Sequence, residues 1–286
     1  MSHEFMNTRL GLRLVAAAFL GAGIVGGTFA LSACSDDDSE TTTPGFRVDL
    51  GTRIEIEGGL SHTNAFDWDI ELSKVVLSSG PIYYFDGSPI ETAALHPAPA
   101  RPPGTRVFEW FAPRVAHAHP GHYDEGEAKG EMLEAASFDL AVGPASLPTG
   151  EGTSGVFRSA RFTWASPATG PLAAELGGSV LILEGTAEKG TSLVSFRLEA
   201  SEADVLDSAG EPSLEGCTFD EANVQSNGTV TVRVDPSVWL NQAEFDDVLG
   251  DVESGPVLIP RDHPASKAFV RGIKKSSAVR FSFEAN

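Results

Sequence analysis

Three histidines stand close together in the middle of the sequence, in the stretch VAHAHPGHYDEGEAKGEM (residues 115–132). His117 and His119 are two positions apart, so on an extended strand their imidazole rings project from the same face, about 7 Å apart. A Pro-Gly pair follows, which is typical of a strand end and a turn. The turn brings His122 back beside the other two rings. The spacing therefore predicts a cluster of three imidazoles.

Imidazole is a preferred ligand of copper and zinc, and three rings leave one position open for water or a carboxylate. The sequence therefore predicts a site that holds copper, or zinc. His62, in the stretch GLSHTNAF beside an expected strand, is the preferred fourth ligand. The acids after the cluster are expected to fill the open position or to orient the rings from the second shell; they are Asp124, Glu125 and Glu127. Two other interpretations stay open: a pH-sensitive structural turn, and an exposed loop that binds nothing.

The usual catalytic signatures are missing from the sequence. It has no G-x-S-x-G, no P-loop, no H-E-x-x-H and no C-x-x-C. Three histidines with an open position also suit a metalloenzyme, but no general acid or base stands out among the many carboxylates. The sequence therefore favours a protein without catalytic activity and ranks an enzyme last.

The first 33 residues have the features of a secretory signal peptide. Arg9 and Arg13 precede a long apolar run, which ends in Leu-Ser-Ala-Cys at Cys34. This tetrapeptide resembles the lipobox of bacterial lipoproteins, and the resemblance implies cleavage before Cys34 and acylation of that cysteine. The rival interpretation is an uncleaved anchor helix, but the glycines of the apolar run make a poor bilayer-spanning helix. Residues 1–5 read as a vector remnant or a misassigned start.

Residues 34–44 predict a lipidated cysteine followed by a disordered tether, because SDDDSETTTPG has no apolar anchor to offset its ordering entropy. The expected location is the cell envelope, facing the periplasm and held to the membrane by the lipid on Cys34. Ser35 favours the outer membrane by the enterobacterial sorting rule. The net charge of −20 argues against nucleic acid and anionic lipid as partners, since both need a basic footprint.

Residues 45–286 are expected to form one domain of the all-β class. Apolar and polar residues alternate in the segments that lie between turns rich in Gly, Pro, Asp and Ser, as in FDWDIEL at 66–72. Each strand is therefore expected to have one buried and one solvent-exposed face. About ten such segments predict an antiparallel β-sandwich with one or two short helices, at 241–252 and 263–275. A long loop expected at 142–155 leaves a division into two subdomains open.

Cys217 is the only cysteine besides Cys34, so the acylated chain has no internal disulfide. We favour a buried small apolar residue at this position over a free thiol that binds a soft metal. Trp68 and Trp110 are expected in the core rather than as oxidised cofactors.

Three stretches resemble a group of lipoproteins from high-GC soil bacteria such as myxobacteria: FDWDIELSKVVLSSGPIYYFDG, AHAHPGHYDEGEAKGEML and VTVRVDPSVWLNQAEFDDV. This resemblance covers most of the mature chain and implies no activity. A second similarity is to the periplasmic copper proteins associated with methanobactin uptake, and it rests on residues 234–245 and on Ala268 to Ile273. It implies copper held by histidines. Because no ligand motif matches, no family residue is carried over to His62 or His117.

The leading hypothesis is a periplasm-facing lipoprotein that binds copper or zinc for metal acquisition, buffering or delivery. The alternative is a structural or interaction lipoprotein of the envelope with an incidental histidine loop. Its contact patch for an envelope protein partner would be made by exposed aromatics, namely Tyr83, Tyr84 and Trp110.

Overall fold

Alternating apolar residues build the strands, and β1 (Arg47–Ile56) illustrates the pattern. Val48, Leu50 and Ile54 are buried on one side, while most of the residues between them reach solvent. The computed structural model describes residues 45–89, 123, 125–248 and 255–286. Residues from Pro44 to Asn286 group into one compact unit.

The described residues form thirteen strands and four short α-helices. After β1, the strands are β2 (Ser61–Thr63), β3 (Asp69–Phe85), β4 (Ala128–Met132), β5 (Ala136–Asp139), β6 (Ala145–Thr153), β7 (Gly155–Trp164), β8 (Ser179–Lys189), β9 (Ser192–Ser201), β10 (Ser213–Val224), β11 (Gly228–Val234), β12 (Val257–Leu258) and β13 (Val279–Ala285). The helices are α1 (Ala173–Leu176), α2 (Glu202–Val205), α3 (Pro236–Leu240) and α4 (Pro264–Ile273). No helix in these residues is long and apolar enough to cross a membrane.

Eight of the strands close into a ring of hydrogen-bonded neighbours. The order is β3-β4-β6-β1-β11-β13-β10-β7, and β7 pairs with β3 again. Opposite walls of the ring therefore face each other across a shared core, which aromatic side chains fill. Their ring centroids lie between 5.6 and 6.2 Å apart, and the residues are Tyr84, Phe157, Phe219 and Phe281.

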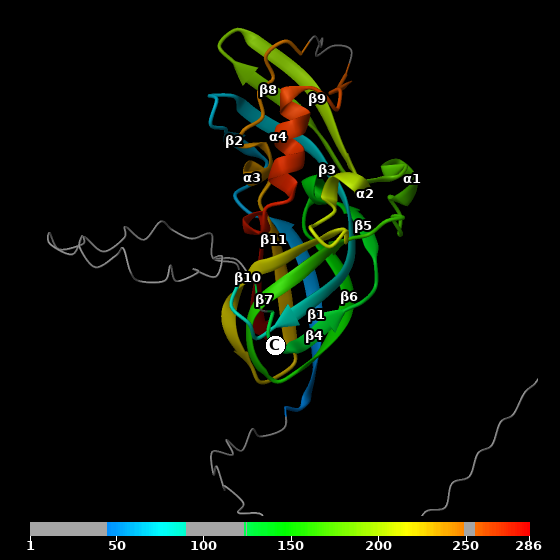
Figure 1. Cartoon of the computed structure of the whole chain (residues 1–286), viewed down its shortest axis with the longest axis vertical. Helices are drawn as coiled ribbons and strands as arrows, with labels where there is room; N and C mark the ends of the chain where they lie inside the picture. Colours follow the sequence, from blue (N-terminus) through cyan, green and yellow to red (C-terminus); the bar gives the residue numbers. More distant parts are fainter. Residues whose placement is uncertain (1–44, 90–122, 124, 249–254) are drawn as a thin grey trace, which may run out of the picture. The chain divides into compact units, whose positions relative to one another are not determined.

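The long strand β3 belongs to two parts of the sheet. Residues Ser79–Phe85 pair with β7 inside the ring, whereas Asp69–Leu77 pair with β8. The sheet then continues from β8 to β9 and β12. Figure 1 shows β8 and β9 at the upper end of the molecule, with α4 lying in front of them and α3 beside α4.

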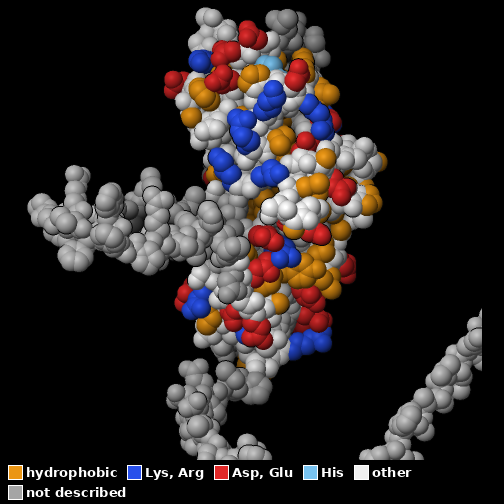
Figure 2. Space-filling view, in the orientation of Figure 1, with side chains coloured by type: hydrophobic (Ala, Val, Ile, Leu, Met, Phe, Trp, Pro, Cys, Tyr) orange, Lys and Arg blue, Asp and Glu red, His pale blue; other side chains and the backbone are white. Residues whose placement is uncertain are grey.

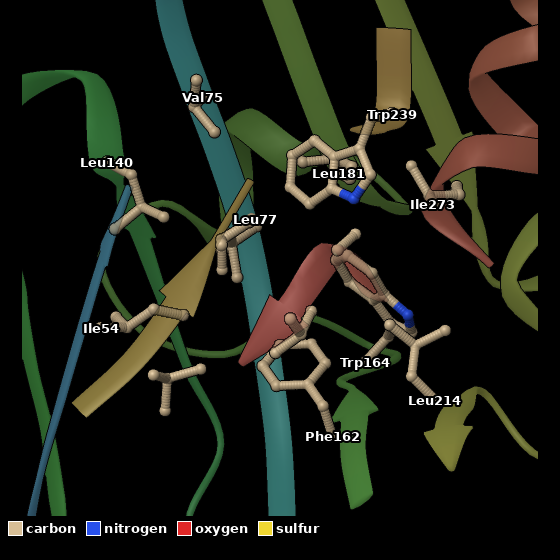
Figure 3. Packing of buried hydrophobic residues seen from close by; sticks show 14 of the residues in the cluster. Ile54, Val75, Leu77, Leu140, Phe162, Trp164, Leu181, Leu214, Trp239 and Ile273 are labelled. Atoms are coloured by element: carbon tan, nitrogen blue, oxygen red, sulfur yellow. The ribbon is translucent and has the colours of Figure 1, made fainter. Parts of the chain in front are cut away.

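One core joins the two parts of the sheet. Trp164 from β7 and Trp239 from α3 are both 1% exposed, and their ring centroids are 6.4 Å apart. Figure 3 shows these two indoles between Phe162 on one side and Leu181 with Ile273 on the other. Packing is therefore continuous from the strand ring to the helices.

The expected all-β class with few helices is confirmed. The sheet is mixed, because three pairings are parallel: β1 with β11, β10 with β13, and β9 with β12. The stretch 142–155 was expected as a long loop, but most of it is strand β6, which pairs with β1 and β4. Its Gly and Pro residues carry no alternation, so the local pattern hides a strand that long-range pairing creates.

The helix expected at 263–275 is confirmed as α4. His263 begins it, since its Nδ1 accepts a hydrogen bond from the backbone N–H of Ala265 at 3.1 Å. Pro264 then occupies the first helical position, where a missing N–H costs nothing.

The helix expected at 241–252 is wrong over the part that the structure describes, residues 241–248, which contain no helix. Helix α3 forms earlier instead. Asp235 starts it by accepting a hydrogen bond from the backbone N–H of Ser237 at 2.9 Å, and Pro236 fits the first turn.

Candidate functional site

The structure describes only part of the predicted metal site. His117, His119, His122 and Asp124 lie outside the described residues. Glu125, Glu127 and His62 lie within them, as does Tyr123, which directly follows His122. The described residues therefore show how the histidine segment, residues 90–122, joins the sheet at its two ends.

Tyr123 is fixed to the strand ring. Its phenol oxygen lies 2.7 Å from the hydroxyl oxygen of Ser159, a fully buried residue of β7. Burial raises the pKa of Tyr123, and the hydrogen bond to Ser159 partly opposes this. The phenol is therefore neutral at physiological pH. A fixed, neutral anchor stands one residue after His122.

The two ends of the segment meet at its base. The backbone N–H of Gly87 donates to the carbonyl of Glu125 at 2.9 Å, and that of Asp86 donates to the carbonyl of Glu127 at 3.2 Å. The Asp86 carboxylate in turn accepts from the N–H of Glu127 at 2.7 Å. Gly126 has φ 72°, and a Cβ there would overlap that carboxylate and approach the nitrogen of Gly87 to 2.7 Å. Only glycine fits at position 126, where the two ends of the segment meet.

The two described acids of the predicted second shell are already paired with cations. Glu125 forms an ion pair with Arg161, whose guanidinium also lies 5.9 Å from the ring centre of Phe85. Glu127 accepts from Lys129 at 2.6 Å, and this bond is the main reason that the pKa of Lys129 is raised. Both carboxylates thus tie the segment to the sheet, and a metal bound by either one would share it with a cation.

His62 lies elsewhere in the fold. It stands in β2 opposite Ile70, near the start of β3, whereas the histidine segment leaves β3 after its last residue, Phe85. Fifteen residues of strand separate Ile70 from Phe85, or about 50 Å measured along the strand. The structure therefore does not bring His62 to the base of the histidine segment. Because His117, His119 and His122 lie outside the described residues, His62 as their fourth ligand stays a prediction.

His62 has its own surroundings. It lines an open groove of about 390 Å³ together with polar and acidic residues of β2, β3 and β8, among them Asp69, Glu71 and Glu188. Partial burial lowers the pKa of His62, and the charge of Asp235 partly opposes this. The described part of the chain contains no group of three or more His, Cys, Asp or Glu side chains able to hold a metal ion.

Cys217 is a core residue, as the sequence favours. Its side chain is fully buried in β10 and its Sγ donates to the carbonyl of Leu214 at 3.4 Å. Burial raises the pKa of the thiol to about 12, so the thiolate that a soft metal requires does not form. Trp68 is also buried, 1% exposed, whereas Trp110 lies outside the described residues.

The aromatic patch expected for a protein partner is not formed by Tyr84. This residue is completely buried inside the strand ring, where it stacks on Phe157, and Tyr83 is half-buried. Neighbouring residues of a strand point to opposite faces, so Tyr83 and Tyr84 cannot share one patch.

Sequence reasoning missed a group of cations on α4. The stretch SKAFVRGIKK places Lys267, Arg271, Lys274 and Lys275 at helical spacing, a pattern that identifies one face of a helix. Their significance depends on which neighbouring side chains pair with them, and the sequence does not contain this information.

Comparison of the chain with protein-family models, with curated proteins and with solved structures finds no match.

Proposed function

We propose that the protein is a lipoprotein, anchored through Cys34 and facing the periplasm, that binds copper or zinc through His117, His119 and His122. Its role is metal acquisition, buffering or delivery. The His-x-His-x-x-His spacing supports three converging imidazoles, and the open fourth position suits either metal.

The anchored base of the segment is the observation that carries the proposal. Tyr123 is hydrogen-bonded to buried Ser159, and Glu125 is paired with Arg161, so the chain is fixed immediately after His122. A fixed base lowers the conformational entropy that is lost when the rings gather around an ion, and affinity rises accordingly.

The acids next to the cluster have different roles in this proposal. Glu125 and Glu127 are held by Arg161 and Lys129, so they position the segment instead of binding the ion. Asp124 stands between the anchors Tyr123 and Glu125 and is the carboxylate proposed for the open position. His62 is left out of the ligand set because of its place in β2.

Competitive titration with Cu(II) and Zn(II) tests the proposal, in the presence of a chromophoric chelator. The untagged protein is expected to bind about one equivalent with sub-micromolar affinity. The variant with His117, His119 and His122 all changed to alanine is expected to lose that affinity. A double variant, His62→Ala with His96→Ala, is the matched control and is expected to bind as the unchanged protein does. Absence of sub-micromolar binding, or equal binding by the triple variant, would refute the proposed site.

The lipid anchor is tested separately in cells. A Cys34→Ala variant is expected to move from the membrane fraction to the soluble fraction, because the acyl chains are the proposed attachment. Retention of this variant in the membrane fraction would contradict anchoring through Cys34.

A further inference from the structure

The protein is strongly acidic, with a net charge of −20, and most of its described cations are neutralised locally. Arg47, for example, pairs with Glu151, and Arg197 lies between Glu184 and Glu199. Lys189 is an exception, and it lies 5.6 Å from the ring centre of Trp68. The remaining cations with a carboxylate partner are Arg53, Lys74, Lys129, Arg158, Arg161, Arg233, Arg261 and Arg280.

Four neighbouring cations depart from this pattern. Within the described residues, none of them has a carboxylate partner, and all four are exposed; they are Lys267, Arg271, Lys274 and Lys275. Lys267 and Arg271, four positions apart, share one side of α4, and Lys274 and Lys275 directly follow the end of the helix. Figure 2 shows Lys and Arg side chains gathered over α4 on the upper part of the molecule. We call these four residues the basic face.

The opposite side of α4 is fixed in the core, so the basic face has a defined orientation. Phe269 and Ile273 are completely buried. Gly272 lies against the backbone of Trp239, where a Cβ would come 2.6 Å from its Cα. The helix cannot turn its cations inward.

Helix stability accounts for only part of this arrangement. Cations near the C-terminus favour the helix dipole, which suits Arg271, Lys274 and Lys275. Lys267 stands in the first turn, where the dipole disfavours a positive charge and where no acid compensates it. The helix dipole therefore does not account for Lys267.

A groove runs beside the basic face. It has a volume of about 320 Å³, and α4 contributes Ser266, Lys267, Val270 and Arg271 to its lining. Two acids, Glu199 and Asp204, also line it, and Glu199 is paired with Arg197 at 2.7 Å. Arg261 lies at its edge, 2.9 Å from Asp204. Both lining acids are thus paired with arginines, so the unpaired charges of the groove are those of Lys267 and Arg271, next to the apolar side chain of Val270.

We propose that the basic face and its groove dock an extended acidic segment of a partner protein. Residues four apart on a helix differ by about 6 Å along its axis. Alternate side chains of an extended chain are about 6.6 Å apart and point the same way. Two acids at alternate positions of such a segment can therefore meet Lys267 and Arg271, and acids further along it can meet Lys274 and Lys275 after the helix end. This proposal is independent of the metal site.

An anionic membrane fits the same cations less well. The basic face is short: Lys267 and Arg271 are about 6 Å apart along the helix axis, which is within the Debye length at physiological salt. A short peptide interacts within that distance. A membrane plane also meets exposed acids beside the face, such as Asp262, and the strongly negative protein as a whole repels it.

The probe for the test is a fluorescein-labelled twelve-residue peptide of alternating Glu and Ser, with a Lys-Ser peptide as the sign control. Fluorescence anisotropy measures binding to the full chain at low and physiological ionic strength. Neutralising the basic face with Lys267→Gln, Arg271→Gln, Lys274→Gln and Lys275→Gln is expected to weaken binding of the Glu-Ser peptide at least about tenfold. The pair Lys267→Gln with Arg271→Gln, which leaves the helix end intact, is expected to show a smaller loss.

A matched control lowers the net charge by the same four units, but on the strand ring and away from α4. Its substitutions are Thr153→Glu, Gln225→Glu, Ser226→Glu and Asn286→Asp. This control is expected to bind the Glu-Ser peptide within about twofold of the unchanged protein. An equal loss in the control means that net charge alone governs binding, and it overturns the proposal. So does a failure of the unchanged protein to prefer the Glu-Ser peptide. A third outcome is binding to vesicles with 30% phosphatidylglycerol and no binding to the Glu-Ser peptide. This outcome assigns the basic face to lipid and also overturns the proposal.

Discussion

Replacement of Gly272 by alanine reverses the usual effect of this substitution. In the interior of an ordinary helix, Gly→Ala stabilises by about 0.5–1 kcal/mol, because glycine loses more backbone freedom on folding. At Gly272 the new Cβ would lie 2.6 Å from the Cα and 2.7 Å from the carbonyl carbon of Trp239. These are backbone atoms of α3, so no side-chain rotation relieves the overlap.

The expected magnitude follows from these two opposing terms. Forcing extra volume into a packed core costs about 1–3 kcal/mol, and contact with two backbone atoms places Gly272→Ala at the upper end. After the gain in helix propensity is subtracted, we expect a net loss of about 2 kcal/mol. For a domain of this size, the melting temperature falls by about 2–4 °C for each kcal/mol.

Urea unfolding followed by the fluorescence of buried Trp164 and Trp239 measures the change. The matched control is Gly51→Ala in β1, where the nearest atoms to the new Cβ are 3.5 Å away, an ordinary contact. The control is expected within about 0.5 kcal/mol of the unchanged protein or above it. A Gly272→Ala variant at least as stable as the unchanged protein would refute the packing of α3 on α4.

Tyr123→Phe removes the hydrogen bond to buried Ser159 and is expected to lower the free energy of unfolding by about 0.5–1.5 kcal/mol; no change in urea unfolding would mean that the anchor does not hold. Because burial raises the pKa of Cys217 to about 12, native protein is expected to resist iodoacetamide at pH 8.5 and to react only when unfolded. The unfolded chain loses the thiol proton first, so this thiol also makes stability fall as pH rises above about 9, up to about 12. Burial lowers the pKa of His62, so the unfolded chain binds a proton more readily and stability is expected to fall as pH drops below about 6.5. His62→Gln should flatten that fall, and an unchanged pH profile of the melting temperature would contradict it.

Much of the fold was predictable where the chain alternates regularly. In β1 and the first part of β3, apolar residues at every second position reveal strands with one buried face, whereas residues 75–80 of β3 are all buried. In β10 the pairing with β7 shifts between Leu214 and Cys217 and again between Thr218 and Ala222, so the alternation is broken and the strand was missed. Closure of the ring depends on pairings such as β1 with β11, between strands almost the whole domain apart, and no local pattern encodes them.

The candidate site, too, could be predicted only in part. The spacing of His117, His119 and His122 can be read directly from the sequence. The contact of Glu125 with Arg161 joins residues 36 positions apart, so only the folded chain reveals that this acid is an anchor. His62 was chosen for its residue type, and it stands beside the start of β3, far along that strand from the base of the histidine segment.

Elemental analysis of the protein purified without a histidine tag from its native host tests metal binding most directly. We predict about one equivalent of copper or zinc per chain, and its loss when His117, His119 and His122 are changed to alanine together. Protein that carries no metal above the level of the buffer, or a triple variant that retains the same amount, would contradict the central claim.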